Sequence, residues 1–124
     1  MLEAYTLNVA VGANAAIPFN NVSVEKGCTA NLNAPASIEL NKCGVYMVSF
    51  DGVAAASTTV QLYKDGVAQP QAQSTGTVVS FVTLVQVDRN NCRCNCCTSP
   101  VTLRLLNTTA TTFTNANICV TKLC

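Results

Sequence analysis

The feature that most restricts the fold of this chain is a two-residue alternation of side chains. It is longest in residues 77–88, TVVSFVTLVQVD. One set of alternate positions there is Val79, Phe81, Thr83, Val85 and Val87, and the other is Val78, Ser80, Val82, Leu84 and Gln86. Successive side chains of a strand point to opposite faces, so this pattern predicts a strand. Because both faces carry apolar residues, we expect this strand to lie in the centre of a sheet.

The same alternation predicts further strands over residues 44–50, 58–63, 101–107 and 117–124. Lys64-Asp65-Gly66 follows the second of these at once and predicts a hairpin turn in which Gly66 takes a positive φ. Shorter segments at 4–11, 15–24 and 37–40 are interrupted by glycine or proline, which favours edge strands or strand starts.

No stretch of the sequence has the 3.6-residue period of an amphipathic helix. Many short strands separated by turns predict an all-β fold, an antiparallel β-sandwich of the jelly-roll or immunoglobulin kind. The chain has no Trp, whereas immunoglobulin domains commonly bury one against a disulfide, and this favours the jelly roll. With no linker or internal repeat, residues 1–124 are expected to form a single domain.

The charge content limits the classes of partner. Charged residues make up 10% of the chain and apolar residues 49%, so we expect the surface to be either covered, as by burial between subunits, or made of Ser, Thr and Asn. A net charge of +1 without Lys/Arg runs gives no basic surface for a phosphate backbone, so no nucleic-acid partner is expected. No window approaches the roughly 20 apolar residues of a membrane span, and the first residues lack the pattern of a signal peptide.

Several segments together resemble a known family. They are IPFN (17–20), SIELNKCGVYMVSF (37–50), TTVQLYKDGVAQ (58–69), the long apolar strand and the final ICVTKL (118–123). This series resembles the jelly-roll heads of complement-component and tumour-necrosis-factor-like proteins over most of the chain. It is most similar to bacterial and bacteriophage versions, such as the heads of collagen-like spore-surface glycoproteins and phage head-fibre or decoration proteins.

The resemblance implies a homotrimer whose inner-sheet side chains meet at a threefold axis. The residues that it offers for this trimer seam, or alternatively for the core of one chain, are Tyr46, Val48, Phe50, Phe81, Val85 and Leu103. It departs from the spore-surface version because no collagen-like Gly-x-y segment is present and because the chain has eight cysteines.

The sequence lacks the residues and motifs of the common catalytic sites. There is no His, which excludes the usual Ser-His-Asp and Cys-His arrangements, and the six acidic residues are scattered singly. Phosphate-binding and dinucleotide-binding glycine motifs are absent, so we expect no cofactor and no enzymatic activity.

The cysteines allow three interpretations. Cys92, Cys94, Cys96 and Cys97 could bind a metal only if the segment curls, because the C-x-C-x-C-C spacing differs from paired C-x₂₋₄-C zinc motifs. A redox pair needs Cys94 and Cys97 to open a helix, and no helix is predicted. Disulfide formation is the favoured interpretation of these cysteines. The remaining candidates for disulfides are Cys28, Cys43, Cys119 and Cys124, with a connectivity that the sequence leaves open.

The expected function is therefore a non-enzymatic structural component of a phage virion surface. Such a protein is made in the host cytoplasm and can oxidise after lysis, which would reconcile eight cysteines with the lack of a signal peptide. Its expected partners are a capsid or other virion protein and surface glycans. The alternatives are a bacterial spore-surface or cell-surface head of the same fold, and a receptor-binding ligand.

Overall fold

The computed structural model describes residues 1–27, 29–87, 92–93, 96–97 and 101–123, with the backbone alone described for 92–93 and 96–97. In this part of the chain the regular structure consists of strands that pair antiparallel. The strands are β1 (Leu2–Val11), β2 (Ala15–Ala16), β3 (Asn21–Glu25), β4 (Ala30–Ala34), β5 (Ser37–Leu40), β6 (Gly44–Lys64), β7 (Val67–Val87), β8 (Cys92–Arg93), β9 (Cys96–Cys97), β10 (Val101–Asn107) and β11 (Thr111–Lys122). β8 pairs with β9 as a separate two-stranded sheet.

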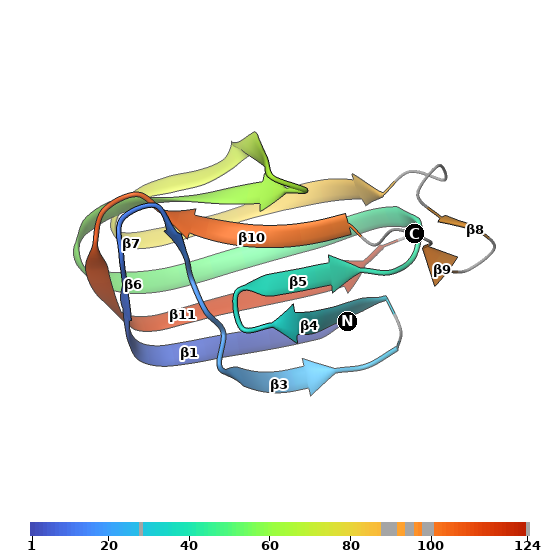
Figure 1. Cartoon of the computed structure of the whole chain (residues 1–124), viewed down its shortest axis with the longest axis horizontal. Helices are drawn as coiled ribbons and strands as arrows, with labels where there is room; N and C mark the ends of the chain where they lie inside the picture. Colours follow the sequence, from blue (N-terminus) through green and yellow to red (C-terminus); the bar gives the residue numbers. More distant parts are fainter. Residues whose placement is uncertain (28, 88–91, 94–95, 98–100, 124) are drawn as a thin grey trace.

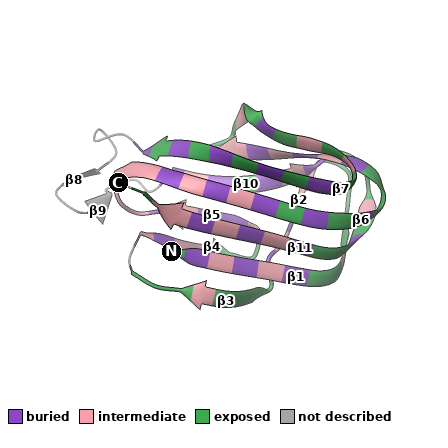
Figure 2. Ribbon diagram, turned by 180° about the vertical axis from the view of Figure 1, so that it is seen from behind, coloured by how far each residue is buried: buried purple, intermediate pink, exposed green. Residues whose placement is uncertain are grey.

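The strands form the two layers of a sandwich. The order along the main sheet is β3-β1-β11-β6-β10-β5-β4, with β7 paired to β6 and β2 to β10. Figure 1 shows β10, β5 and β4 lying over β6, β11 and β1, and Figure 2 shows the latter three in front when the molecule is seen from behind. We call the layer with β3, β1 and β11 the first layer and the layer with β10, β5 and β4 the second layer.

Two long strands pass from one layer to the other. β6 pairs with β11 through Tyr46–Ala54 and with β10 through Val60–Lys64, and β7 follows β6 through both segments. The register of the β6–β7 pair shifts between Val53 and Thr58, which marks the bend. β7 returns through Gly76, whose φ of 141° is a conformation that other residues rarely adopt. This hairpin therefore joins the two layers at one edge of the sandwich.

The core lies between the layers and is lined by alternate residues of each strand. Val48 and Phe50 of β6 stand beside Val120 and Ile118 of the neighbouring β11 in this interior. These four side chains and Tyr46 are 0–1% exposed. The Phe50 and Phe81 rings lie 5.7 Å apart between centroids, with an interplanar angle of 34°. Burial of these side chains between two layers supplies the main stabilising free energy of such a sandwich.

One expectation about strand positions is wrong. We expected residues 77–88 to form a central strand, but within the described chain β7 pairs with β6 alone and is an edge strand. The alternation itself is correct, with Val79, Phe81 and Val85 inside. The second apolar face, which suggested a central position, is exposed to solvent.

The expectations for the shorter segments are confirmed in part. β3, in the segment 15–24, is an edge strand, as expected. β1 and β5 are not, because β1 lies between β3 and β11 and β5 lies between β10 and β4. The predicted turn at residues 64–66 is confirmed, with φ of 50° at Asp65 and 80° at Gly66. The described part of the chain contains no helix of the length and apolarity needed to cross a membrane.

Candidate functional site

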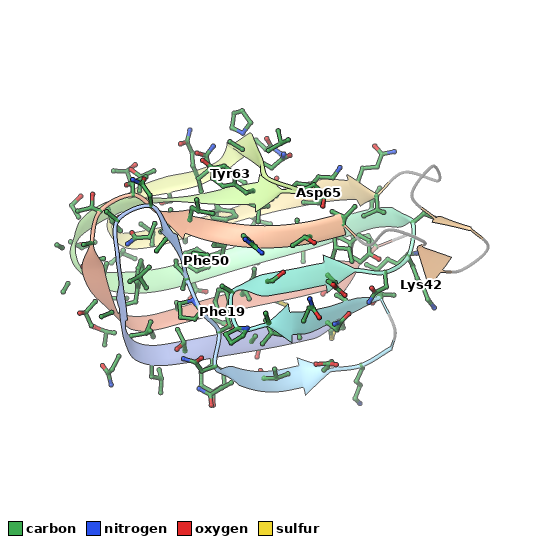
Figure 3. The ribbon with its side chains drawn as sticks, viewed as in Figure 1. Phe19, Lys42, Phe50, Tyr63 and Asp65 are labelled. Carbon is green, nitrogen blue, oxygen red and sulfur yellow. The ribbon has the colours of Figure 1, made fainter. Side chains whose placement is uncertain are left out.

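The surface of the second layer contains an open hollow of about 540 Å³ next to the β6–β7 turn. This volume is within the range of small-molecule sites in proteins. The hollow, which we call the outer hollow, is lined by Tyr63, Asp65, Gly66, Thr102, Arg104 and Leu106. Figure 3 shows Tyr63 and Asp65 beside each other at the upper edge of the sandwich, above β10.

Strand pairing brings these side chains together. On β10, Leu103 and Leu105 are buried in the core, so Thr102, Arg104 and Leu106 point to the outside. Tyr63 of β6 stands directly opposite Arg104 in the β6–β10 register. Directly opposed residues of antiparallel strands have Cβ atoms about 4.5–5.5 Å apart, so the phenol ring and the guanidinium group are neighbours.

Asp65 fixes the turn against β10. Its backbone N–H donates to the Thr102 carbonyl oxygen at 2.8 Å, and its carboxylate Oδ1 accepts from the Thr102 N–H at 2.8 Å. These two hydrogen bonds hold the left-handed Asp65 backbone in place and present the carboxylate at the rim of the hollow. Asp65 is therefore positioned by rigid strands, although it lies in a turn.

Arg104 is the cationic side chain of the outer hollow. It is exposed, and within the described chain its guanidinium group forms no ion pair or hydrogen bond. The nearby Lys64 ammonium donates instead to the Gln86 carbonyl oxygen at 2.6 Å. Glu39 lies on β5 opposite Thr102 and does not line the hollow. The hollow thus combines an aromatic ring, a cation without an ion pair among the described residues, and an anchored carboxylate.

A second surface feature follows the outer face of the first layer. Val78, Val82 and Leu84 of β7 are 68%, 64% and 59% exposed, and we call these three residues the β7 strip. They stand opposite Val53, Ser49 and Met47 of β6, respectively. Single exposed apolar residues are ordinary, whereas three on one face of an edge strand, interrupted only by Ser80, form an apolar patch.

The six side chains expected at a trimer seam or in the core lie in the interior of the single chain. Tyr46, Val48, Phe50, Phe81, Val85 and Leu103 are each 0–9% exposed. They occupy the face of their strands opposite the β7 strip and the outer hollow. An intersubunit contact through these six residues would need the sandwich to open.

The expected disulfides are not found among the cysteines whose side chains are described. Cys43 and Cys119 are both half-buried and free. Cys28, Cys94 and Cys124 lie outside the described residues, and so do the side chains of Cys92, Cys96 and Cys97. The disulfide and metal predictions for those six therefore stay predictions. Within the described residues, no group of three or more Cys, Asp or Glu side chains could hold a metal ion.

Tyr46 organises the end of the sandwich at which β6 begins. Its hydroxyl donates to the Lys42 carbonyl oxygen at 2.7 Å and accepts from the Lys42 N–H at 3.3 Å, and the Thr29 carbonyl oxygen lies 3.2 Å away. Burial raises the pKa of Tyr46 above 10.0, the hydrogen bond from Lys42 partly opposes this, and Cys43 adds to the rise. Tyr46 is thus a neutral side chain of the core that connects two loops.

We expect Tyr46→Phe to lower the free energy of unfolding by about 1–2 kcal/mol at pH 8, because the partly buried Lys42 and Thr29 carbonyl groups lose a donor. The raised pKa means that the folded chain holds the phenol proton more tightly than the unfolded chain. Wild-type stability is therefore complete below pH 10 and falls as the pH rises above it. Urea unfolding of both proteins between pH 8 and pH 11 should show a steeper fall for the wild type. If the stabilities of the two proteins fell in parallel with pH, Tyr46 would not have a raised pKa in the folded chain.

Comparisons with known proteins were made for both sequence and structure. Protein-family models give no match, and neither do curated protein sequences. Among solved structures, the globular domain of zebrafish complement 1qA protein is similar over 99% of this chain and 96% of its own, with a TM-score of 0.75 and 9% identity. The expected jelly-roll fold is confirmed.

Two further structures have the same jelly roll. Rabbit GITRL matches 100% of this chain and 95% of its own length at a TM-score of 0.64 and 12% identity. Murine APRIL matches 98% of both chains at a TM-score of 0.64 and 8% identity. At these identities the likeness concerns the fold alone. The expected closeness to bacterial and phage versions stays a prediction.

Proposed function

We propose that the chain is a non-enzymatic, trimer-forming head domain in which copies associate through the first layer. The observation that carries this proposal is the β7 strip, an exposed apolar row on an edge strand. An edge strand offers unpaired backbone groups and, here, an apolar face, and both favour contact with another chain. Most soluble oligomers consist of identical chains in closed symmetry.

A polar group on the same face supports the proposal. Asn117 of β11 alternates with the buried Ala116 and Ile118, so its side chain lies on the outer face of the first layer, opposite Asp51 of β6. Its Oδ1 is buried without a hydrogen-bond partner in the described chain. A buried unsatisfied acceptor is costly, and a contact that rotates the Asn117 amide toward a donor of a neighbouring copy would remove this cost.

The resemblance of the sequence and the likeness of the fold to complement-type heads support a threefold arrangement. The β7 strip of one copy would pack on the first layer of the next. The six candidate residues Tyr46, Val48, Phe50, Phe81, Val85 and Leu103 would support this surface from the interior without reaching the seam.

Val82→Glu tests the trimer. We expect wild-type protein, kept in reductant with chelator, to have a light-scattering mass near three chains of 13.0 kDa. Val82 is 64% exposed in the single chain, so a glutamate there leaves the fold intact, but it would be buried without a partner at the seam. The variant should therefore be monomeric, with the trimer weakened at least about 100-fold.

The matched control is Val67→Glu, the same change at a position that is 63% exposed but lies on the second layer. It should leave the trimer intact. A monomeric wild type, or a Val82→Glu variant with the wild-type mass, would contradict the proposal. A trimer that forms without chelator and is lost when chelator is added would instead assign assembly to the cysteine-rich segment.

The finer assignment that we propose is a component of a phage virion surface, a head fibre or decoration protein. The low charge content and the series of resembling segments support it. Mass spectrometry of purified virions, compared with spores and cell-surface fractions of the host, should detect the chain in the virions. Detection only in spores or on the cell surface would favour the alternative, a bacterial surface head. A catalytic turnover that is lost on replacing one acid or cysteine would contradict the non-enzymatic role.

A further inference from the structure

We infer that the outer hollow is a binding site for a carboxylate-bearing saccharide, such as a chain that contains uronic acid residues. The inference deepens the proposed surface role by naming a ligand class for it. The six lining residues that the structure describes come from β6, the turn after it and β10. The hollow also lies on the second layer, away from the β7 strip, and so would stay open in the proposed trimer.

The Arg104 side chain favours a ligand with a negatively charged group. Arg104 is exposed at the hollow, and the described residues provide it with no ion pair. A guanidinium group presents two parallel N–H donors that match the two oxygens of a carboxylate. The anchored Asp65 carboxylate beside it disfavours a doubly charged ligand such as a phosphate monoester. The hollow therefore offers one cation for one carboxylate, and the Asp65 carboxylate remains for the hydroxyl groups of the ligand.

The remaining lining residues select a polyhydroxylated ring. The ring of Tyr63 and the side chain of Leu106 provide an apolar wall against which the C–H face of a pyranose can pack. Asp65 uses Oδ1 for the Thr102 N–H, while Oδ2 has no hydrogen bond to described residues and can accept from a sugar hydroxyl. The Thr102 hydroxyl adds a group that can donate or accept.

The neighbouring surface is rich in amide groups. Gln61 and Gln73 stand opposite each other on the β6–β7 pair, and Leu106 stands opposite Gln61 on the other side. The Gln61 side chain donates to the Gln69 carbonyl oxygen at 3.4 Å and the Gln73 side chain to the Pro70 carbonyl oxygen at 3.3 Å. Both amides keep an acceptor oxygen for further sugar hydroxyls, so a ligand longer than one ring could extend in this direction.

The experiment is an amide-resolved NMR titration with trigalacturonic acid and with its fully methyl-esterified form. We expect shifts at residues 63–66 and 102–106 and a dissociation constant of about 0.1–1 mM for the acid, as is usual for a small, open site. The methyl ester should bind at least about 10-fold more weakly, because it keeps the rings and loses the charge. Equal binding of acid and ester, or shifts elsewhere on the chain, would overturn the inference.

Variants assign the interaction to the hollow. Arg104→Gln should weaken the binding of trigalacturonic acid at least about 10-fold, and Arg104→Lys should weaken it less, since the charge stays and the paired donors are lost. Lys26→Gln removes the same charge at an exposed position outside the hollow and should leave affinity unchanged. If Lys26→Gln weakens binding as much as Arg104→Gln, the attraction is non-specific and the inference fails. Tighter binding of triglutamate than of the saccharide would assign the hollow to an acidic peptide instead.

The outcome for the hollow can be separated from the outcome for the trimer. The Val82→Glu variant should bind the trisaccharide with the wild-type dissociation constant. A wild-type protein that binds but has the mass of one chain would support the hollow and contradict the trimer. A protein with the mass of three chains and no shifts in the titration would support the trimer and contradict the binding site in the hollow.

Discussion

Phe50→Ala is expected to lower the free energy of unfolding by about 3–5 kcal/mol, the range that truncation of a buried phenylalanine usually costs. Phe50 is 1% exposed and contacts the Phe81 ring across the β6–β7 pair. The ring is closely packed against its surroundings. Even a Cβ atom added at Gly52 would come within 3.2 Å of the Phe50 ring and of the Asn115 carbonyl oxygen. The truncation therefore leaves a cavity as well as removing buried apolar area.

Urea unfolding followed by circular dichroism measures this change. Domains of this size have total stabilities of about 5–15 kcal/mol, so the loss is a large fraction of the whole. Val67→Ala is the control, because Val67 is 63% exposed, and it should change stability by less than about 0.5 kcal/mol. A loss below about 1 kcal/mol for Phe50→Ala would mean that the ring does not lie in a closed core.

The strand faces could be predicted from the sequence because alternation depends only on neighbouring residues. Leu103 and Leu105 inside, with Arg104 outside, follow from the pattern of β10, and the left-handed turn at Asp65-Gly66 follows from its residue types. The position of a strand within the sheet depends on partners elsewhere in the chain. Residues 77–88 therefore looked central, although β7 is an edge strand in the described structure.

The passage of β6 from one layer to the other also could not be predicted from the sequence. Separate strands were predicted over residues 44–50 and 58–63, yet β6 continues through Ala54–Ala56 between them, from Gly44 to Lys64. Small side chains fit a bend between layers as well as they fit a loop, and only the distant pairings with β11 and β10 distinguish the two cases.

The outer hollow was missed for a related reason. Tyr63 and Arg104 are each ordinary outward residues of predicted strands, 41 positions apart in the sequence, and they meet only through the β6–β10 register. The one local signal was the Asp65-Gly66 turn. A site built from a turn and a non-adjacent strand becomes visible only when that pairing is known.

Asn107→Ala is expected to lower the free energy of unfolding by about 2–4 kcal/mol, because Asn107 is the centre of a buried polar network. The Asn107 side chain is 0% exposed. Its Oδ1 accepts from the Thr58 hydroxyl at the bend of β6, and its Nδ2 donates to the Thr109 carbonyl oxygen at 2.6 Å. The Val11 and Gly12 carbonyl oxygens lie 3.4 Å from the same Nδ2. An alanine leaves these groups buried without their partner.

Two further variants distinguish a loss of hydrogen bonds from a loss of volume. Asn115→Ala makes the same truncation at an exposed position and should change stability by less than about 0.5 kcal/mol. Asn107→Asp keeps the size and the acceptor of the side chain but turns a carboxylate oxygen toward the Thr109, Val11 and Gly12 carbonyl groups. At pH 7 it should be at least as destabilising as alanine. If Asn107→Asp were as stable as the wild type, the amide donor would have no structural role. The connection of β10 to the ends of β1 and the bend of β6 would then depend on apolar packing alone.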